Sequence, residues 1–413
     1  MKKIISFNAL RPVSDKAREV AIYSNNLLRD DERRERARKN PNSFAHVVKP
    51  KIDFADIQIP PANELMKYSK NYLQKLIEQG VLVNDNSAYF YIYRQQLHGH
   101  SQSGIVCCYH LDEYRNGKIK KHEHTREEKE KENVVHLKAS EIQGNPVFLA
   151  YKGADAIDVF VFEIQQRQPL YDFISDFDVR QTVWAVSDKN EIEKLSSLLN
   201  QHVTESYIAD GHHRAASMKL FSDEMKSSKQ NHTGEEPYNY LFACLFPANQ
   251  LKIFEYNRSV KDLNGNTEDE LISKISEWFS VEITDAHFKP KDIHQFGMYM
   301  HQQWYKLTAK KSAYTNNPVD VLDVSILQEK ILSPLLGIDD PRTDKRIDFI
   351  EGTKGIQALE KKVNKGKASV AFALHPVSMD QLFAISDAGE VMPPKSTWFE
   401  PKLMSGLLIY KMS

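Results

Sequence analysis

Apolar and polar residues alternate along the chain with periods that predict both helices and strands. Between residues 63 and 78, apolar or aromatic side chains recur every three or four positions, at Leu65, Tyr68, Tyr72, Leu73 and Leu76. This spacing places them on one face of an amphipathic helix, and a glycine at position 80 follows as a helix stop. A charged run at 27–39 has alternating signs, which suits an exposed helix that ends before Pro41.

Shorter runs of β-branched and aromatic residues predict strands. The runs 88–94 and 103–109 flank a polar segment that contains glycine, so we expect a hairpin. Further strands are predicted at 4–12, 146–151, 159–162, 182–186 and 206–209, and the apolar run 240–246 is typical of a buried strand. A charged run at 116–132 interrupts this pattern. Helices are expected at 191–199 and from residue 212 onward, where Ala215, Met218, Phe221 and Met225 keep helical spacing.

The pattern changes at about residue 265. Beyond this point we expect helices at 268–279 and 320–332, a strand at 369–374, and a proline-rich segment near 392–394. We therefore predict two regions, 1–264 and 265–413, with the second region returning to the site formed by the first.

Composition limits the kinds of partner that this protein can have. Its 413 residues include 55 Lys plus Arg and 56 Asp plus Glu, so there is no general basic field of the kind that drives non-specific binding to nucleic acid. No stretch approaches the length of apolar sequence that a membrane helix needs, and the first residues lack the pattern of an export signal. Three cysteines, two of them adjacent, fit a reducing cytoplasm.

The strongest local signal is the segment 207–214, where a predicted strand meets Asp210, Gly211, His212, His213 and Arg214 at the start of a helix. The first N–H groups of a helix lack intrahelical acceptors and its dipole is positive there, so an anion is favoured. Glycine lets a phosphate approach the backbone, and arginine can bind two of its oxygens. The same residues also suit a capped helix with surface histidines, or a metal bound by aspartate and histidine.

Two further clusters could meet phosphate. Residues 118–126 combine lysines, histidines and a threonine, but the acidic residues at 127–132 could neutralise them on a solvated helix face. Residues 392–402 place Lys395, Ser396, Thr397 and Lys402 among prolines and aromatics, which equally suits a tail docked in a groove. The glycine-rich loops of the common nucleotide folds and the Gly-x-Ser-x-Gly elbow of hydrolases are absent from the sequence.

These motifs, in this order, resemble a bacterial family catalogued as domain of unknown function 1015. The similarity rests on residues 9–12, 40–44, 93–94, 120–125, 144–149, 209–214, 236–239 and 393–402. The Asp-Gly-His-His-Arg turn is similar to the phosphate-binding signature of the ParB/sulfiredoxin superfamily. The resemblance implies an α+β protein, with a ParB/sulfiredoxin-like core and a mixed sheet embedded in a larger family-specific α/β fold.

One branch of that superfamily, the free serine kinases, carries a similar Asp-Gly-His-x-Arg turn and phosphorylates the hydroxyl of free L-serine. The resemblance implies that Gly211, His213 and Arg214 hold phosphate, and that Asp210 takes part in catalysis and binds magnesium. It also assigns catalytic roles to His212 and to Glu123, the latter as the base. The remaining candidates for binding the nucleotide or its phosphates are Lys120, Lys121, His122, Thr125, Lys395, Ser396 and Thr397.

One departure from the resemblance concerns the N-terminal region. Relatives usually show Pro-Pro-Tyr-Asp after the Ala-Leu-Arg-Pro start, whereas this chain has Val-Ala-Ile-Tyr-Ser-Asn-Asn at 20–26, so the acidic position is replaced. Because the serine kinases draw a carboxylate from their N-terminal region, the change implies altered chemistry or a loss of activity. Glu19 is a candidate replacement.

The sequence therefore predicts a cytoplasmic, nucleotide-dependent phosphotransferase that uses ATP or ADP with magnesium and acts on a small hydroxyl metabolite, with free L-serine as the acceptor that the resemblance indicates. A non-catalytic nucleotide-binding regulatory protein is the alternative. Sequence-specific DNA binding of the ParB type is disfavoured, because the net charge is −1 and no helix-turn-helix signature is recognisable.

Overall fold

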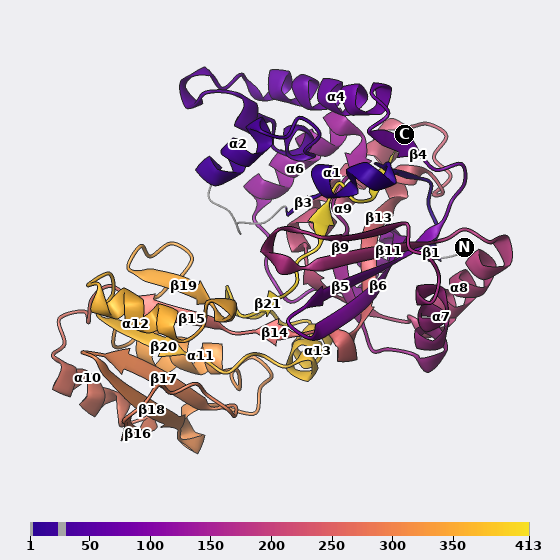
Figure 1. Cartoon of the computed structure of the whole chain (residues 1–413). Coiled ribbons are helices and arrows are strands. Elements are labelled where there is room, and N and C mark those ends of the chain that lie inside the picture. Colours follow the sequence, from indigo (N-terminus) through magenta and orange to yellow (C-terminus); the bar gives the residue numbers. More distant parts are fainter. Residues whose placement is uncertain (1–2, 24–29, 413) are drawn as a thin grey trace. The chain divides into compact units, whose positions relative to one another are not determined.

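The computed structural model describes residues 3–23 and 30–412, and the chain divides into two units (Figure 1). Unit 1 comprises Met1–Lys120, His124–Leu251 and Pro401–Ser413, and unit 2 comprises Lys121–Glu123 and Lys252–Glu400. The divisions between the units do not coincide with the boundary near residue 265 that the sequence predicts. The end of the chain belongs to the first unit.

The main sheet of unit 1 is mixed. Its strands follow the order β10 (Tyr171–Ile174), β11 (Arg180–Val186), β5 (Phe90–Leu97), β6 (His100–His110), β13 (Tyr240–Pro247), β9 (Val147–Tyr151), β12 (Ser206–Asp210) and β7 (Ile119–Lys120), with β1 (Ile4–Ile5) beside β6. β9 is parallel to β13, and β7 is parallel to β12. The predicted hairpin is confirmed as β5–β6, and every residue of β13 is buried, as its apolar run indicates.

The prediction of a strand at 159–162 is wrong, because these residues lie in helix α7 (Asp155–Gln165). The run Val-Phe-Val-Phe has strand-like composition, but the residues that the helix buries are spaced at helical intervals, at Ile157, Phe160, Val161 and Ile164. Val159 and Phe162 are 58% and 63% exposed. The period of the whole segment, rather than the chemistry of four residues, decided its structure.

The other helices predicted in unit 1 are confirmed. They are α2 (Asp30–Arg38), α4 (Ala62–Glu78), α8 (Lys189–His202) and α9 (His212–Ser228), and residues 27–29 of the predicted charged helix lie outside the described residues. The charged run 116–132 divides between the edge strand β7 and the start of helix α6 (Glu127–Ser140). Within α6, Glu127 pairs with Lys131 at 3.2 Å, the helical spacing at which opposite charges stabilise one another.

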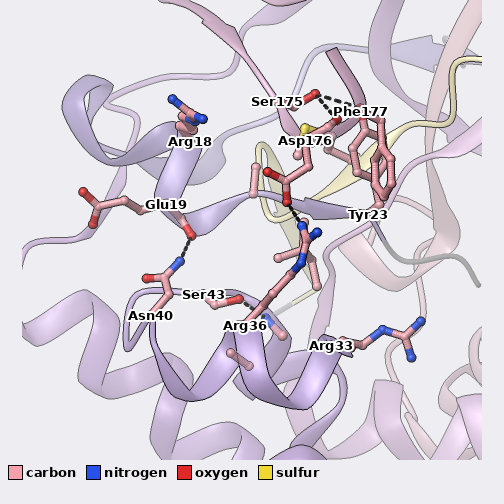
Figure 2. Close-up of a pocket in the computed structure, with 15 residues that line it drawn as sticks. Arg18, Glu19, Tyr23, Arg33, Arg36, Asn40, Ser43, Ser175, Asp176 and Phe177 are labelled. Carbon is pink, nitrogen blue, oxygen red and sulfur yellow. Dashed lines mark hydrogen bonds and ion pairs between the residues drawn. The ribbon is translucent and has the colours of Figure 1, made fainter. Parts of the chain in front are cut away.

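Unit 1 also encloses a small cavity, shown in Figure 2. Its wall is formed by helix α1 (Ala17–Val20), strand β3 (Ile22–Tyr23), helix α2, the segment 40–45 and the turn η4 (Asp176–Asp178). Strand β3 pairs with β22 (Met404–Ser405), so the C-terminal segment reaches this part of the unit as well.

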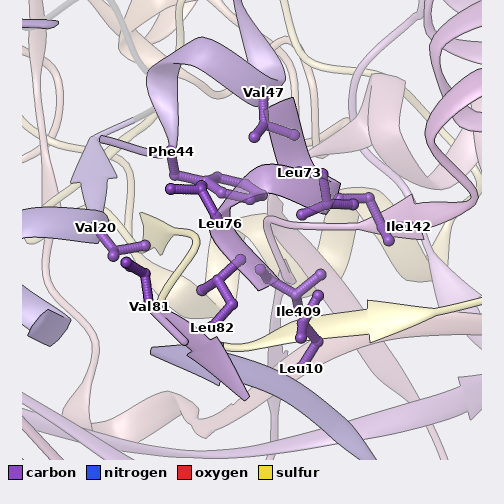
Figure 3. Packing of buried hydrophobic residues seen from close by; sticks show 10 residues of the cluster. All are labelled: Leu10, Val20, Phe44, Val47, Leu73, Leu76, Val81, Leu82, Ile142 and Ile409. Atoms are coloured by element: carbon purple, nitrogen blue, oxygen red, sulfur yellow. The ribbon is translucent and has the colours of Figure 1, made fainter. Parts of the chain in front are cut away.

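A second sheet of unit 1 brings both ends of the chain together. Its order is β4 (Leu82–Asn84), β2 (Ala9–Pro12), β23 (Ile409–Lys411) and β8 (Ile142–Gln143). An apolar core packs on it, with contributions from α4, the helix α3 (Ala45–Val48) and β23 (Figure 3). The core residues are Leu10, Val20, Phe44, Val47, Leu73, Leu76, Val81, Leu82, Ile142 and Ile409. Burial of Ile409 among them anchors the chain's last segment, which carries Lys402 into unit 1.

Unit 2 contains an antiparallel sheet with the order β16 (Phe279–Thr284), β18 (Gln303–Ala309), β17 (Gln295–Met300), β20 (Val370–Ala373), β15 (Tyr256–Val260) and β19 (Ile347–Glu351). β20 confirms the strand predicted at 369–374. The helix predicted at 268–279 ends earlier, as α10 (Glu268–Ile275), because Phe279 begins β16 instead. The helix predicted at 320–332 is present as α11 (Asp323–Leu327), continued by a π-helical turn over Gln328–Leu332.

Candidate functional site

The turn between β12 and α9 is shaped by Gly211. Its φ is +106°, a left-handed conformation that side chains with a Cβ rarely adopt. A Cβ at this position would lie 2.8 Å from Nη2 of Arg214, so the arginine folds back over the turn where the glycine leaves room. The glycine therefore leaves room for the Arg214 side chain as well as for any ligand that approaches the turn.

Asp210, Arg214 and Lys402 form a partly buried charge triad at this turn. Lys402 Nζ lies 3.0 Å from Oδ1 of Asp210, and Arg214 Nη2 donates to Oδ2 at 2.5 Å. The Lys402 side chain is 7% exposed, and those of Arg214 and Asp210 are 27% and 28% exposed. Burial by itself would raise the pKa of Asp210, but Lys402 and Arg214 lower it to about 2. The carboxylate is therefore ionised, and the triad carries one excess positive charge.

Arg214 is also fixed by the backbone just before strand β9. Its Nη1 donates to the carbonyl of Pro146 at 2.6 Å and approaches that of Asn145 at 3.4 Å. These residues belong to the Gly-Asn-Pro-Val segment at 144–147, for which sequence reasoning assigned no role. Two carbonyls and one carboxylate thus orient the guanidinium.

The two histidines at the start of α9 differ in their surroundings. His212 is 5% exposed. His213 is half-buried, and its Nε2 accepts the backbone N–H of Arg126 at 3.2 Å. Burial lowers the pKa of His213, and the nearby positive charges of Arg126 and Lys129 lower it further, so the ring is neutral with its proton on Nδ1.

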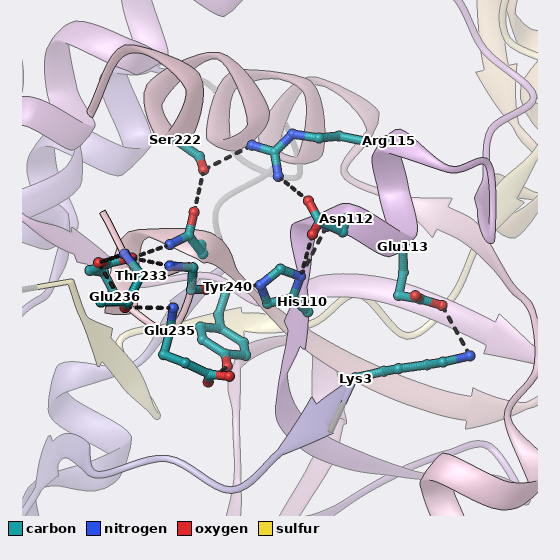
Figure 4. Close-up of polar contacts among 12 residues, drawn as sticks. Lys3, His110, Asp112, Glu113, Arg115, Ser222, Thr233, Glu235, Glu236 and Tyr240 are labelled. Carbon is teal, nitrogen blue, oxygen red and sulfur yellow. Dashed lines mark hydrogen bonds and ion pairs between the residues drawn. The ribbon is translucent and has the colours of Figure 1, made fainter. Parts of the chain in front are cut away.

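Polar contacts also hold the second half of α9, and Figure 4 shows the contact between Arg115 and Ser222. Arg115, on helix α5 (Leu111–Arg115), donates to Ser222 at 2.9 Å and to Asp223 at 2.6 Å. Nearby, Glu236 accepts the backbone N–H groups of Thr233 and Gly234 at 2.6 and 2.9 Å. The Glu-Pro-Tyr-Asn segment that begins at this glutamate therefore closes a loop.

The lysine-rich cluster at 118–126 is divided between the two units. In unit 1, Lys120 lies beside β12 but its Nζ pairs with Glu205 at 3.0 Å, and Thr125 is half-buried just before α6. Lys121, His122 and Glu123 belong to unit 2. There the carbonyl of His122 accepts the N–H of Met392 at 2.9 Å, so the tripeptide contacts the proline-rich segment.

Within unit 2, the predicted phosphate ligands of the proline-rich segment have structural partners. Ser396 is 5% exposed and donates to the carbonyl of Pro393 at 2.6 Å, while Thr397 is half-buried. Lys395 is exposed, with its Nζ 5.4 Å from the centre of the Tyr256 ring. Burial lowers the pKa of the His122 imidazole to about 4, so this ring is neutral.

A cavity of about 830 Å³ lies in unit 1 next to Arg214. Its wall is formed by α2, α4, α6, α9 and the turn η2 (Pro50–Asp53). Among the described residues that line it, six side chains are cationic and one is acidic: Arg33, Arg34, Lys49, Lys51, Lys129 and Arg214 against Glu132. Apolar residues form much of the rest of the wall, among them Val48, Ile52, Ile59, Leu65, Met66, Val135, Leu137, Ile142, Val147 and Met218. We call this space the basic cavity.

Sequence reasoning missed every residue of the basic cavity except Arg214. Each cation there lies in a charged run or a short turn, where it looks like an ordinary solvated residue. Only the packing of five separate elements brings them to one space.

The predicted magnesium site at Asp210 does not fit the side chains around it. Both oxygens of this carboxylate are already bound by cations of the chain, Lys402 and Arg214. Among the residues that the structure describes, no group of three or more His, Cys, Asp or Glu side chains could hold a metal ion. We therefore derive no chemical step through a metal at this position.

The protein has a mixed α/β fold with several sheets, and its basic cavity lies beside the start of helix α9. The chain belongs to the family described as protein of unknown function (DUF1015), whose model matches residues 4–325. No curated protein matches the sequence. The ParB/sulfiredoxin-like core stays a prediction.

Several solved structures are similar to this chain at low identity. A mutant of a free serine kinase in complex with AMP has a TM-score of 0.36 and 14% identity, covering 73% of this chain and 90% of that chain. A conserved hypothetical protein from Pyrococcus furiosus has a TM-score of 0.34 and 14% identity, with coverage of 73% and 94%. SbnI with a C-terminal truncation, from Staphylococcus aureus, has a TM-score of 0.37 and 10% identity, with coverage of 73% and 85%. Separately, every helix in the described part of the chain is too short or too polar to cross a membrane.

Proposed function

We propose that this protein is a nucleotide-dependent phosphotransferase that acts on a small hydroxyl compound, with free L-serine as the first acceptor to test. The observation that carries the proposal is the basic cavity. A nucleotide needs cations for its phosphates and an apolar surface for its base, and the wall supplies both. Its volume of about 830 Å³ lies within the usual range of small-molecule sites.

Two of the ion pairs in the wall of the basic cavity are compatible with an anionic ligand. Arg34 pairs with Asp56 at 2.6 Å, and Lys129 pairs with Glu132 at 2.9 Å. Both pairs have well-exposed members, so a phosphate can displace these carboxylates at little cost. Lys51, also exposed, adds a further charge to the same wall.

In this proposal the start of α9 meets the phosphates. Gly211, His213 and Arg214 hold phosphate oxygens, and the excess charge of the triad stabilises the transferred group. The acceptor hydroxyl attacks the terminal phosphorus, its proton passes to a carboxylate, and the shortened nucleotide leaves. The roles of Glu123 as the base, and of Lys120, Lys121, Lys395 and the hydroxyls predicted with them as phosphate ligands, stay predictions of the sequence.

The second candidate is a regulatory protein that binds a nucleotide without turning it over. The occupied oxygens of Asp210 favour it, because a magnesium ion would have to displace Lys402 there. The acidic position that relatives carry is replaced in the 20–26 segment, of which Ser24, Asn25 and Asn26 lie outside the described residues.

The first experiment is a thermal-shift panel of ATP, ADP, CTP and GTP, with and without magnesium. A nucleotide at 100 times its Kd adds about 2.7 kcal/mol to the stability of the protein, which raises Tm measurably. Serine is then added and phosphoserine is sought by mass spectrometry. Stabilisation with serine-dependent product supports the kinase, stabilisation without product supports the regulator, and no stabilisation by any nucleotide refutes both.

Variants locate the binding. Lys51→Ala and Lys129→Ala remove cations from the wall of the basic cavity and should weaken nucleotide binding about tenfold each, the usual worth of a charged hydrogen bond. Lys131→Ala is the matched control, because this lysine is exposed on the same helix outside the wall. Arg214→Ala is a poor probe, since it also removes the donor to the carbonyls of Asn145 and Pro146 and one of the two cations that bind Asp210.

A further inference from the structure

The small cavity of unit 1 has the composition of a second ligand site. Its volume is about 480 Å³, and Figure 2 shows the residues of α1, β3, α2 and η4 that line it. Among the described residues of its wall, three are arginines, Arg18, Arg33 and Arg36, and two are acidic, Glu19 and Asp176. Arginines from two helices therefore line one cavity.

The carboxylates of this wall are already engaged by groups of the chain. Glu19 accepts from Asn42 at 2.7 Å and from Lys16 at 3.0 Å, and these contacts lower its pKa. Asp176 is paired with Arg36. Among the described residues of the wall, three arginines stand against two carboxylates that groups of the chain already engage, and this composition favours an anion.

One side of the small cavity is a strained turn that presents an aromatic ring. Phe177 and Asp178 have φ values of +67° and +59°, a left-handed conformation that is unfavourable for residues other than glycine. The turn is held by Ser175, whose side chain contacts Tyr23 and the carbonyl of Val179, both at 2.8 Å. This arrangement sets the Phe177 ring edge-on to Tyr23, with centroids 5.6 Å apart (Figure 2).

The strained turn explains how charge and aromatic surface come to share the same wall. One short turn carries both the Phe177 ring, which lies against Tyr23, and the Asp176 carboxylate, which pairs with Arg36. Sparsely populated conformations persist where the surrounding contacts hold them, and they are frequent at ligand sites. The Phe177 side chain nevertheless stays 43% exposed, which leaves aromatic surface for a ligand to cover.

We propose that the small cavity binds a second small molecule, one that joins a carboxylate or phosphate group to a planar or apolar body. The guanidinium groups of Arg18 and Arg36 take the anionic group, because a planar fork of donors matches the oxygens of either anion. Phe177 and Tyr23 take the body. The assignment is independent of the phosphotransferase proposal, since it concerns a different cavity and needs no nucleotide.

The variants are chosen according to which of the two cavities each arginine lines. Arg33 lines both the small cavity and the basic cavity, so its removal would not separate the two sites. Arg18 is exposed and Arg36 is 51% exposed, and the alanine variants of both should fold. Arg38→Ala is the matched control, because this exposed arginine lies on the same helix as Arg36 but outside the wall.

The test uses the full chain and titrates phenyl phosphate, benzoate, inorganic phosphate and neutral benzamide by calorimetry. We expect phenyl phosphate or benzoate to bind at least fivefold more tightly than inorganic phosphate, and benzamide not to bind. Arg18→Ala and Arg36→Ala should each weaken binding five- to tenfold, while Arg38→Ala leaves it unchanged. Phe177→Ala should remove the advantage of phenyl phosphate over inorganic phosphate. Benzoate and phenyl phosphate together tell whether the natural group is a carboxylate or a phosphate.

Several results would overturn the proposal. The first is an absence of binding by all the anionic probes at 10 mM, a concentration chosen to be about ten times the Kd expected of such fragments. The second is binding that survives both Arg18→Ala and Arg36→Ala in proteins with unchanged thermal melts. The third is binding that is lost in Lys129→Ala, which would place the probe in the basic cavity.

Discussion

Replacing Lys402 by methionine tests whether the charge triad holds the end of the chain to the start of α9. A pKa of about 2 for Asp210, against 3.8 for an ordinary aspartate, corresponds to about 2.5 kcal/mol of stability at neutral pH. Lys402 supplies the largest favourable part, and Arg214 and His212 also lower the pKa. Since the Asp210 side chain is 28% exposed, water screens part of this attraction, and we expect Lys402→Met to cost about 1–2 kcal/mol.

The pH dependence has a definite sign. Because the folded-state pKa of Asp210 is lowered, its contribution is fully present above about pH 4 and is lost as the pH falls through about 2. In Lys402→Met the pKa rises, so acid destabilises the variant from a higher pH. Hydrogen exchange, followed by mass spectrometry on the peptides of β12 and α9, measures the local opening free energy at each pH.

A double-mutant cycle with Asp210→Asn isolates the pair from other effects of either substitution. Lys411→Met, in the same C-terminal segment but on β23, is the control and should leave exchange in α9 unchanged. A coupling energy below about 0.5 kcal/mol, or equal effects of Lys402→Met and Lys411→Met, would refute the triad as a stabilising contact.

Three further predictions rest on local geometry and titration. Gly211→Ala should cost about 2–3 kcal/mol in urea unfolding, against about 1 for Gly117→Ala, because both have positive φ but only the first Cβ meets a side chain. Burial raises the pKa of Asp323 to about 7, so the free energy of unfolding should decline from about pH 4 to pH 7. Asp323→Asn should reduce that decline by about 3 kcal/mol. An unchanged slope of stability against pH in calorimetry would contradict this. Burial would lower the pKa of His46, but Asp53 raises it above 6.5. The stability contributed by the His46–Asp53 pair is therefore present below pH 6.5 and is lost at higher pH, and His46→Gln should remove this dependence of stability on pH.

The sequence determined the elements whose period is regular and whose ends carry stop signals. The amphipathic spacing of Leu65, Leu73 and Leu76 predicts α4, because this pattern depends only on residues that are close together in the chain. The strand-turn-helix around Gly211 was predictable for the same reason, since an Asp-Gly turn before a helix is a local property. The strand predicted at 159–162 was wrong, because a run of four residues is too short to reveal a helical period.

Tertiary structure alone decided what meets at the site. Lys402 is 192 positions from Asp210, and only the insertion of β23 beside β2 carries that lysine to the carboxylate. The basic cavity draws its cations from helices that are far apart in sequence, and no local pattern distinguishes Lys51 or Lys129 from solvated lysines. Local propensity fixes elements because it depends on neighbours along the chain. Burial and charge pairing depend on which elements pack together, and the sequence by itself left that undetermined.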